Sequence, residues 1–297
     1  GEAQIWRERL CERLAPLLPS ETRGMPMTRD DLASAFLQRH GFGAATLGPR
    51  SADASFRSYR RAVGGAYPAL LMDAPPDREQ LRPFVEVAAH LRRLGLSAPT
   101  IPAVDFEQGF ALVEDFGDAT FTHLLDAGAD PAQLYAQAVD ALVALQRHPD
   151  TAAIAVPAYD LGFFRTETQL FLDWYWPAVR VESAPVAARD AFLAALDAVL
   201  YPVLSARPSV MVHRDFHVDN LMVIAGREGA QACGLLDFQD ALIGPPAYDL
   251  VSLLEDARRD VSPALCAAML ARYRSALPKG DAPAFDIAYR ILGAQRH

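Results

Sequence analysis

Lysine is almost absent from this sequence. Of its 28 basic residues only Lys279 is a lysine and the other 27 are arginines, against 37 acidic residues. The formal net charge of -9 gives no positive field to attract a phosphate backbone, which disfavours a nucleic acid partner. Arginine offers a planar fork that suits phosphate and carboxylate ligands. Any phosphate chemistry must therefore rely on arginine for its cations.

Cysteine is scarce and long apolar runs are missing. Cys11, Cys233 and Cys266 lack metal-ligand spacing and cannot all pair within one chain, which favours a reducing compartment. No segment approaches the roughly 20 apolar residues that span a bilayer, and the N-terminal region is charged throughout, unlike a signal peptide. We therefore expect a soluble, cytoplasmic protein with no membrane partner, and nothing indicates an obligate protein partner.

The length and composition are those of a globular protein. The chain has 297 residues, of which 51% are hydrophobic and 22% charged. This length suits one large domain or two lobes that share a cleft. Residues 1–27 are a candidate N-terminal appendage. Its apolar residues recur at helical spacing over Ile5–Leu18, which is compatible with a helix there.

Residues 28–116 have the pattern of a small α+β lobe. A helix is predicted from Thr28, with Asp31 as its capping-box partner, to the glycine stop at Gly41. A hairpin, a second helix and a further strand follow. Their predicted positions are strands over Phe56–Val63 and Ala69–Met72, a helix opened by Pro75 and Pro76 and ended by Gly95, and a strand over Phe110–Phe116.

Residues 117–297 have a mainly helical pattern and predict a larger, α-rich lobe. Helices are expected near 131–147, 165–180 and 185–204, and another begins near 262. One hairpin interrupts them, with strands over Leu221–Ile224 and Ala232–Phe238. The residues with chemical potential cluster around this hairpin.

Three polar side chains flank this second hairpin. In HRDFHVDN, residues 213–220, Asp215 precedes Asn220 by five positions, and Asp237 follows Asn220 by seventeen. Phosphoryl transfer needs a carboxylate that accepts the hydroxyl proton and oxygen ligands that hold magnesium against the phosphates. The hairpin would bring the three side chains together. Each residue alone has another interpretation, as a turn former or a solvated strand end.

The segments HRDFHVDN, LLDFQD and PPAYDL resemble the signature of the aminoglycoside phosphotransferase and choline kinase-like family, over most of residues 28–297. The resemblance implies a two-lobed protein-kinase-like fold that uses ATP and Mg²⁺. It implies that Asp215 is the catalytic base and contacts the acceptor, and that Asn220 and Asp237 bind the metal. Asp249 resembles a family position that braces the active-site loop. His213 and His217 match family histidines, and we expect them to support the loop by hydrogen bonds.

A narrower resemblance concerns the acceptor. The runs SADASFRSYRR, LLMDAPPDRE and FLDWYW resemble the bacterial anomeric kinases of cell-wall recycling, which transfer phosphate from ATP to the C1 hydroxyl of N-acetylmuramate and N-acetylglucosamine. One alternative is an aminoglycoside kinase or another small-molecule hydroxyl kinase, which would need an acidic pocket for a cationic substrate. Another is a non-catalytic, nucleotide-binding regulatory protein, since the lysine of kinase-like folds is missing.

The family resemblance also indicates the nucleotide site. The segment 51–56 corresponds to the cover over the ATP phosphates, with Met72 on the strand where a lysine is usual. Arg57 or Arg60 would replace that lysine, oriented by Glu86, although surface arginines and a solvated glutamate are an equal alternative. The residues expected at the phosphates are Ser51, Ser55 and Phe56, and those at the hinge that meets adenine are Glu114, Asp115 and Phe116.

An aromatic helix is the candidate acceptor site. The rings of Phe171, Trp174 and Tyr175 would stack on a sugar, although an aromatic helix is more often part of a core and at most one or two rings are expected to face the substrate. Arg165, Arg147 or Arg180 would pair with the lactyl carboxylate of N-acetylmuramate, and nothing in the sequence singles one of them out. We take Arg165 as the candidate substrate-binding arginine.

Overall fold

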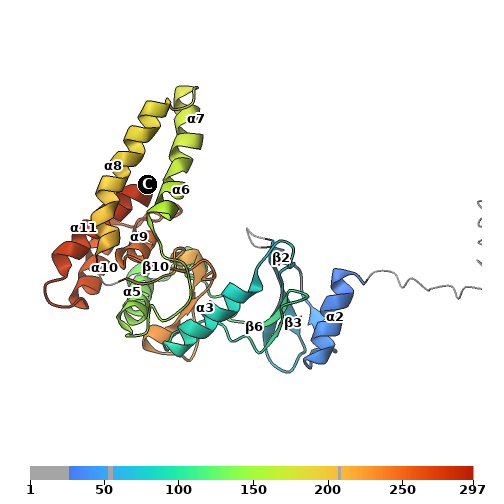
Figure 1. Cartoon of the computed structure of the whole chain (residues 1–297). Coiled ribbons are helices and arrows are strands. Elements are labelled where there is room, and N and C mark those ends of the chain that lie inside the picture. Colours follow the sequence, from blue (N-terminus) through green and yellow to red (C-terminus); the bar gives the residue numbers. More distant parts are fainter. Residues whose placement is uncertain (1–26, 53–55, 207–208, 297) are drawn as a thin grey trace, which may run out of the picture.

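The computed structural model describes residues 27–52, 56–206 and 209–296. An N-terminal antiparallel sheet with two helices adjoins a helical C-terminal region, from which a pair of helical segments extends outward (Figure 1). This arrangement confirms the predicted two-lobed fold. The predicted appendage lies outside the described residues, except for Met27. Within the described ranges no helix is long and apolar enough to cross a membrane.

The N-terminal sheet has six antiparallel strands in the order β1-β3-β4-β6-β5, with β2 paired to β3. The strands are β1 (Thr46–Leu47), β2 (Ser51–Ala52), β3 (Ser58–Val63), β4 (Ala69–Asp73), β5 (Ala103–Asp105) and β6 (Phe110–Glu114). The predicted hairpin is β3 with β4, and its register pairs Ser58 with Asp73. Strand β6 is the last strand of this sheet in sequence order, and it ends at Glu114. The lobe boundary near residue 116 remains a prediction.

Alternate residues of the central strands serve two separate cores, because side chains alternate across a strand. Leu71 and Leu112 pack with Phe36 of α2 (Arg29–Arg39), whose first turn is capped by the predicted Thr28 capping box. Met72, on the other face, belongs to the main core that continues into the C-terminal region. The sheet is therefore tied to both its own helix and the larger lobe.

Helix α3 (Leu81–Arg93) contributes to that connection. Its buried face includes Phe84, whose ring stacks on Phe238 with centroids 5.2 Å apart. The expectation that Pro75 and Pro76 open this helix is wrong. Instead, the Pro75 carbonyl accepts hydrogen bonds from two backbone N–H groups of a separate turn, and the helix begins at Leu81.

The predicted C-terminal helices are present. Residues 131–147 form α5 (Pro131–Arg147), 186–205 form α8 (Val186–Ser205), and α10 (Pro263–Ser275) begins near the expected residue 262. The helix expected over 165–180 is α6 (Leu161–Leu170), a π-helical segment η1 (Phe171–Tyr175) and α7 (Trp176–Arg180). The remaining helices are α4 (Phe121–Asp126), α9 (Ala247–Leu254) and α11 (Ala282–Arg296).

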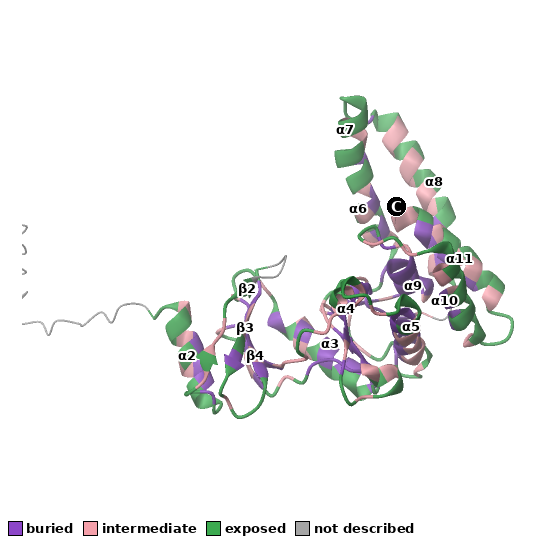
Figure 2. Cartoon of the chain, turned by 180° about the vertical axis from the view of Figure 1, so that it is seen from behind, coloured by how far each residue is buried: buried purple, intermediate pink, exposed green. Residues whose placement is uncertain are grey.

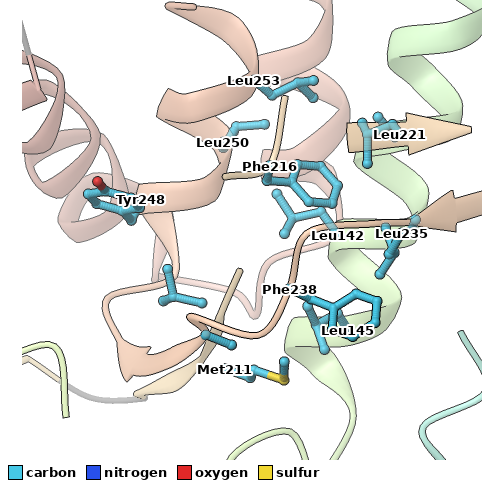
Figure 3. Close-up of a cluster of buried hydrophobic side chains, with 14 of the residues drawn as sticks. Leu142, Leu145, Met211, Phe216, Leu221, Leu235, Phe238, Tyr248, Leu250 and Leu253 are labelled. Atoms are coloured by element: carbon cyan, nitrogen blue, oxygen red, sulfur yellow. The ribbon is translucent and has the colours of Figure 1, made fainter. Parts of the chain in front are cut away.

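The second predicted hairpin is confirmed. Strands β8 (Leu221–Val223) and β9 (Cys233–Leu235) pair antiparallel, with Leu221 opposite Leu235. A second antiparallel pair, β7 (Val210–Val212) with β10 (Leu242–Gly244), was not predicted. In the sequence these two strands flank the hairpin, β7 before it and β10 after it. Figure 3 shows the hydrophobic cluster beneath these strands, in which Phe216 and Phe238 pack with side chains of α5 and α9.

Candidate active site

The loop after β7 has a strained backbone that a buried carboxylate holds in place. Arg214 has a φ of 75°, a conformation that non-glycine residues rarely adopt. Asp249, fully buried in the first turn of α9, accepts hydrogen bonds from the backbone N–H of His213 at 2.8 Å and of Arg214 at 2.9 Å. One turn later, the Ser252 hydroxyl donates to the Arg214 carbonyl at 3.0 Å. This arrangement fixes the direction of the next residue, Asp215.

Asp215, Asn220 and Asp237 lie together at one end of the β8–β9 hairpin. The Asn220 amide donates to the Asp215 carbonyl at 3.0 Å and lies 3.5 Å from the Asp237 carboxylate. The backbone N–H of Leu236, the last residue before Asp237, donates to the Asn220 carbonyl at 2.9 Å. Asp237 itself has a φ of 57°, so the strand turns sharply there. The convergence expected from the hairpin is present.

The donor set at this point suits magnesium. Asn220 and Asp237 offer an amide oxygen and a carboxylate, which are hard ligands. Among the described residues there is no group of three or more His, Cys, Asp or Glu side chains arranged to hold a metal by themselves. Mg²⁺ commonly takes one or two protein oxygens and completes its shell with phosphates and water. The residues therefore fit a metal that arrives with a nucleotide.

A cleft of about 420 Å³ contains these metal-binding candidates and the predicted hinge. It is lined by residues of both lobes, and the predicted ones among them are Ser51, Glu114, Asp115, Phe116, Asn220 and Asp237. Arg61 and the apolar walls of the cleft were not predicted as nucleotide contacts. The apolar lining residues are Tyr59, Leu70, Phe84, Pro99, Val113, Met222 and Leu236. The inward alternation of β3 and β4 was the available signal for Tyr59 and Leu70.

Side chains of the hinge stabilise its shape. Glu114 accepts hydrogen bonds from Arg227 at 2.7 Å and from the Thr100 backbone N–H at 2.9 Å. The Arg227 guanidinium also lies 5.3 Å from the centre of the Phe116 ring. Asp115 forms a salt bridge with Arg61. These contacts tie the hinge to β3 of the N-terminal sheet and to the turn between β8 and β9.

Of the predicted cations, the structure brings one to the metal-binding candidates. Arg57, only 7% exposed, lies 3.3 Å from the Asp237 carboxylate. Arg60 instead contacts Asp30 and the Gly48 carbonyl at the outer part of the sheet. Glu86 pairs with Arg82 at 3.7 Å on the exposed side of α3, rather than with either arginine.

The other residues predicted near the ATP phosphates differ in their surroundings. Ser55 lies outside the described residues. Phe56 is exposed, and its backbone N–H donates to Glu79 at 2.9 Å. Met72 is fully buried in the main core, so its strand position presents no polar group to the cleft.

Both histidines of the loop are buried. Burial lowers the pKa of His213 to about 4, and burial is also the largest cause of the lowered pKa of His217. Both side chains are therefore neutral at physiological pH. The Nε2 atom of His217 lies 3.3 Å from the Asn220 amide, as expected of a residue that supports the loop.

Comparison with known proteins decides the family. Residues 46–284 match the phosphotransferase enzyme family. The chain belongs to this family. It is 36% identical to an N-acetylmuramate/N-acetylglucosamine kinase of Caulobacter vibrioides, over 90% of this chain and 82% of that protein. It is 39% identical to a kinase of the same name from Pseudomonas aeruginosa, over 85% and 74% of the two chains.

Solved structures agree on the fold. The GDP complex of aminoglycoside 2'-phosphotransferase-IIIa superimposes with a TM-score of 0.63 at 13% identity, covering 91% of this chain and 89% of that one. A choline/ethanolamine kinase family protein from Mesorhizobium loti gives a TM-score of 0.58 at 15% identity, covering 89% and 82%. The protein is therefore a small-molecule kinase with a protein-kinase-like fold, and the predicted enzyme class is confirmed.

The kinase has another, larger pocket of about 830 Å³ in the helical C-terminal region. It lies between η1, α8 and α11, where α6, α7 and α8 project from the lobe with much of their surface exposed (Figure 2). Phe171, Trp174 and Tyr175 all line it, and Trp174 is 75% exposed. These three rings are therefore not core residues. The π-helical turn presents them together, and such turns are frequent at functional sites.

This aromatic pocket is connected to the loop that carries Asp215 through Glu167. That residue lines the pocket, and its carboxylate lies 2.9 Å from the guanidinium of Arg214, the neighbour of Asp215. The arginines expected to meet the acceptor do not line it. Arg165 is paired with Asp197, Arg147 donates to the Ala276 carbonyl, and the Arg180 guanidinium lies 5.7 Å from the centre of the Trp176 ring.

Proposed function

We propose that this kinase transfers phosphate from ATP to the C1 hydroxyl of N-acetylmuramate and N-acetylglucosamine. The observation that carries the proposal is the similarity to four kinases named for these two sugars, at 35% to 39% identity over 83% to 90% of this chain. The aromatic pocket, which is linked to the Asp215 loop by the Glu167–Arg214 salt bridge, supports a sugar acceptor, because aromatic faces pack against the apolar C–H surface of a sugar ring.

In this proposal Asp215 is the general base. Among the described residues no hydrogen bond to its carboxylate is present, so both oxygens are available to accept a proton. The clamped backbone of Arg214 fixes where that carboxylate points. In the proposed step the C1 hydroxyl would give its proton to Asp215 as the C1 oxygen attacks the γ-phosphorus. The bond from that phosphorus to the β,γ-bridging oxygen would break, and ADP would leave.

Asn220 and Asp237 are proposed to hold Mg²⁺. When bound, the metal would neutralise charge on the phosphate oxygens. Gln239 supports this role, because its amide donates to Asp237 Oδ1 at 2.8 Å. This bond fixes the carboxylate and orients its other oxygen, Oδ2, towards the side of Asn220.

Arg57 is proposed as the phosphate-binding cation in place of the usual lysine. Its support is its burial and its 3.3 Å distance from the Asp237 carboxylate, which would lie beside the phosphates of bound ATP. A guanidinium can bind two phosphate oxygens at once, so a single arginine can fill this role. Ser51, which lines the cleft, is proposed to contact the nucleotide as well, and the hinge at Glu114–Phe116 to meet its adenine.

We also propose a cytoplasmic role in the recycling of peptidoglycan sugars. ATP is a cytoplasmic co-substrate, and the described cysteines, Cys233 and Cys266, are both free thiols, as expected in a reducing compartment. An aminoglycoside acceptor is less suited to the aromatic pocket. The carboxylate of Glu167 is already paired with Arg214, which leaves little negative charge for a polycation.

The test is ADP release from ATP and Mg²⁺ with four acceptor conditions: N-acetylmuramate, N-acetylglucosamine, kanamycin and no acceptor. The proposal predicts turnover with both sugars and only background release with kanamycin or without an acceptor. Turnover with kanamycin alone would overturn the proposed acceptor. Tight ATP binding without turnover on any acceptor would overturn the proposed reaction.

A further inference from the structure

The aromatic pocket contains two charged side chains among its described lining residues, Glu167 and Arg296. Both carboxylate oxygens of Glu167 already have partners. One of its oxygens lies 2.9 Å from Arg214, and the other accepts a hydrogen bond from the Tyr159 hydroxyl at 2.7 Å. Its charge is neutralised by the Arg214 guanidinium, so the negative group does not dominate the pocket.

Arg296 is in a different situation. It lies in the last turn of α11 and donates to the hydroxyl of the buried Tyr248 at 2.9 Å, with its guanidinium carbon 5.3 Å from the centre of that ring. Within the described ranges no carboxylate forms a salt bridge with it. The Tyr248 hydroxyl and ring hold the guanidinium in place without neutralising its charge. The pocket therefore has on its wall a fixed cation that forms no salt bridge with any described residue.

Such a cation is suited to an acidic sugar. N-acetylmuramate differs from N-acetylglucosamine by a lactyl ether that ends in a carboxylate, and a guanidinium binds a carboxylate through paired, charge-assisted hydrogen bonds. We propose that Arg296 binds the lactyl carboxylate and thereby determines how strongly the kinase prefers the acidic sugar. This inference rests on the proposed function, because it presumes that both sugars are acceptors.

The position of Arg296 favours it over the other arginines of this region. Arg165 is exposed on α6, with its guanidinium neutralised by Asp197. Arg214 faces the same pocket only through Glu167, which already accepts its hydrogen bond. Arg290 lies on α11 as well, but it is exposed and does not line the pocket. Arg290 is therefore a matched control for the loss of one positive charge from the same helix.

The experiment measures kcat and KM for both sugars in the wild type and in Arg296→Gln, Arg290→Gln and Arg165→Gln. For Arg296→Gln we expect kcat/KM for N-acetylmuramate to fall about tenfold to hundredfold more than kcat/KM for N-acetylglucosamine, mainly through KM. Arg296→Lys should recover part of the loss, because it restores the charge without the fork. Calorimetric binding of each sugar without ATP gives a second readout that does not depend on turnover.

The outcomes separate the two claims. If the wild type phosphorylates both sugars and Arg296→Gln lowers both equally, the inference is wrong and the proposed function stands. A selective loss in Arg165→Gln instead would assign the carboxylate to α6 and overturn the inference. If the wild type phosphorylates neither sugar, the proposed function is wrong and the inference is overturned with it. Thermal unfolding of each variant identifies any loss of activity that comes from misfolding. If Arg296→Gln does not fold, the comparison of the two sugars is made with Arg296→Lys instead.

Discussion

The buried carboxylate of Asp249 holds Arg214 in a left-handed backbone conformation through a hydrogen bond of 2.9 Å to its N–H. A second bond, to the N–H of His213, uses the other carboxylate oxygen. The two bonds join α9 to the loop that carries Asp215. The position of the proposed base thus depends on a residue 34 positions later in the sequence that does not take part in the chemistry.

We predict that Asp249→Asn destabilises the protein and lowers turnover. The amide retains one acceptor oxygen where two N–H groups need one each, so a buried donor loses its partner at a cost of about 1–3 kcal/mol. The free energy of unfolding, measured with urea, should fall by that amount, and kcat should fall because Asp215 is less firmly placed. Unchanged stability and activity would show that the clamp has no such role.

The same residue should make stability depend on pH. Burial raises the pKa of Asp249 to about 7, from an ordinary value of 3.8. Between these values the folded state keeps a proton that the unfolded state releases, so this residue's contribution to stability is full below the lower value and is lost as the pH rises towards 7. The unfolding free energy of the wild type relative to Asp249→Asn should therefore fall from pH 4 to pH 7. A difference that rises over this range would contradict the assignment.

Asp215→Asn should abolish most turnover and leave ATP binding close to that of the wild type. An amide cannot accept the acceptor proton, and loss of a general base typically costs about 10²–10⁴-fold in rate. Single-turnover measurements with saturating sugar, together with nucleotide binding by calorimetry, check both parts. Asp140→Asn, an exposed aspartate paired with Arg272, is the control. A variant with near-normal turnover would exclude Asp215 as the base.

The two candidate arginines of the N-terminal sheet should behave differently. Arg57→Ala removes the cation beside Asp237 and should reduce kcat/KM for ATP by about tenfold to hundredfold, the range for a charge-assisted hydrogen bond. Arg60→Ala should have the smaller effect, because Arg60 contacts Asp30 and Gly48. Equal losses, or a larger loss at Arg60, would refute the assignment of the phosphate-binding cation to Arg57.

Gln239 should tune metal affinity. Gln239→Leu has a similar size but loses the donor to Asp237, and loss of such a supporting hydrogen bond typically weakens metal binding about 10–100-fold. The Mg²⁺ concentration for half-maximal activity should rise accordingly. Binding of Mn²⁺ followed by electron paramagnetic resonance, in the presence of ADP, provides a readout without turnover. Metal affinity equal to that of the wild type would contradict this role.

The sequence was informative where one local pattern decides one element. The glycine turn between two apolar runs predicted the β8–β9 hairpin, and that hairpin brings Asn220 and Asp237 together. The helical pattern near residues 131–147 likewise predicted α5 (Pro131–Arg147). These features depend on neighbours in the chain, so local propensity and spacing are sufficient to find them.

Other features depend on distant partners and could not be predicted. Strands β7 and β10 have three residues each and pair across about 30 residues, so neither has a recognisable pattern alone. Glu86 fits the usual pairing by its position on α3, yet the rotation of that helix leaves it on the exposed side with Arg82. Arg296 lines the same pocket as the aromatic rings because α11 packs against α8, a tertiary contact that the sequence pattern does not encode.

The position of the phosphate on the product tests the central claim most directly. Phosphorus NMR of the product from N-acetylglucosamine should show a phosphate coupled to the anomeric proton, and the sugar should lose its reducing end. The methyl glycoside of the same sugar, whose C1 oxygen is blocked, should give no product. A product that keeps its reducing end, or turnover of the methyl glycoside, would contradict phosphorylation at C1.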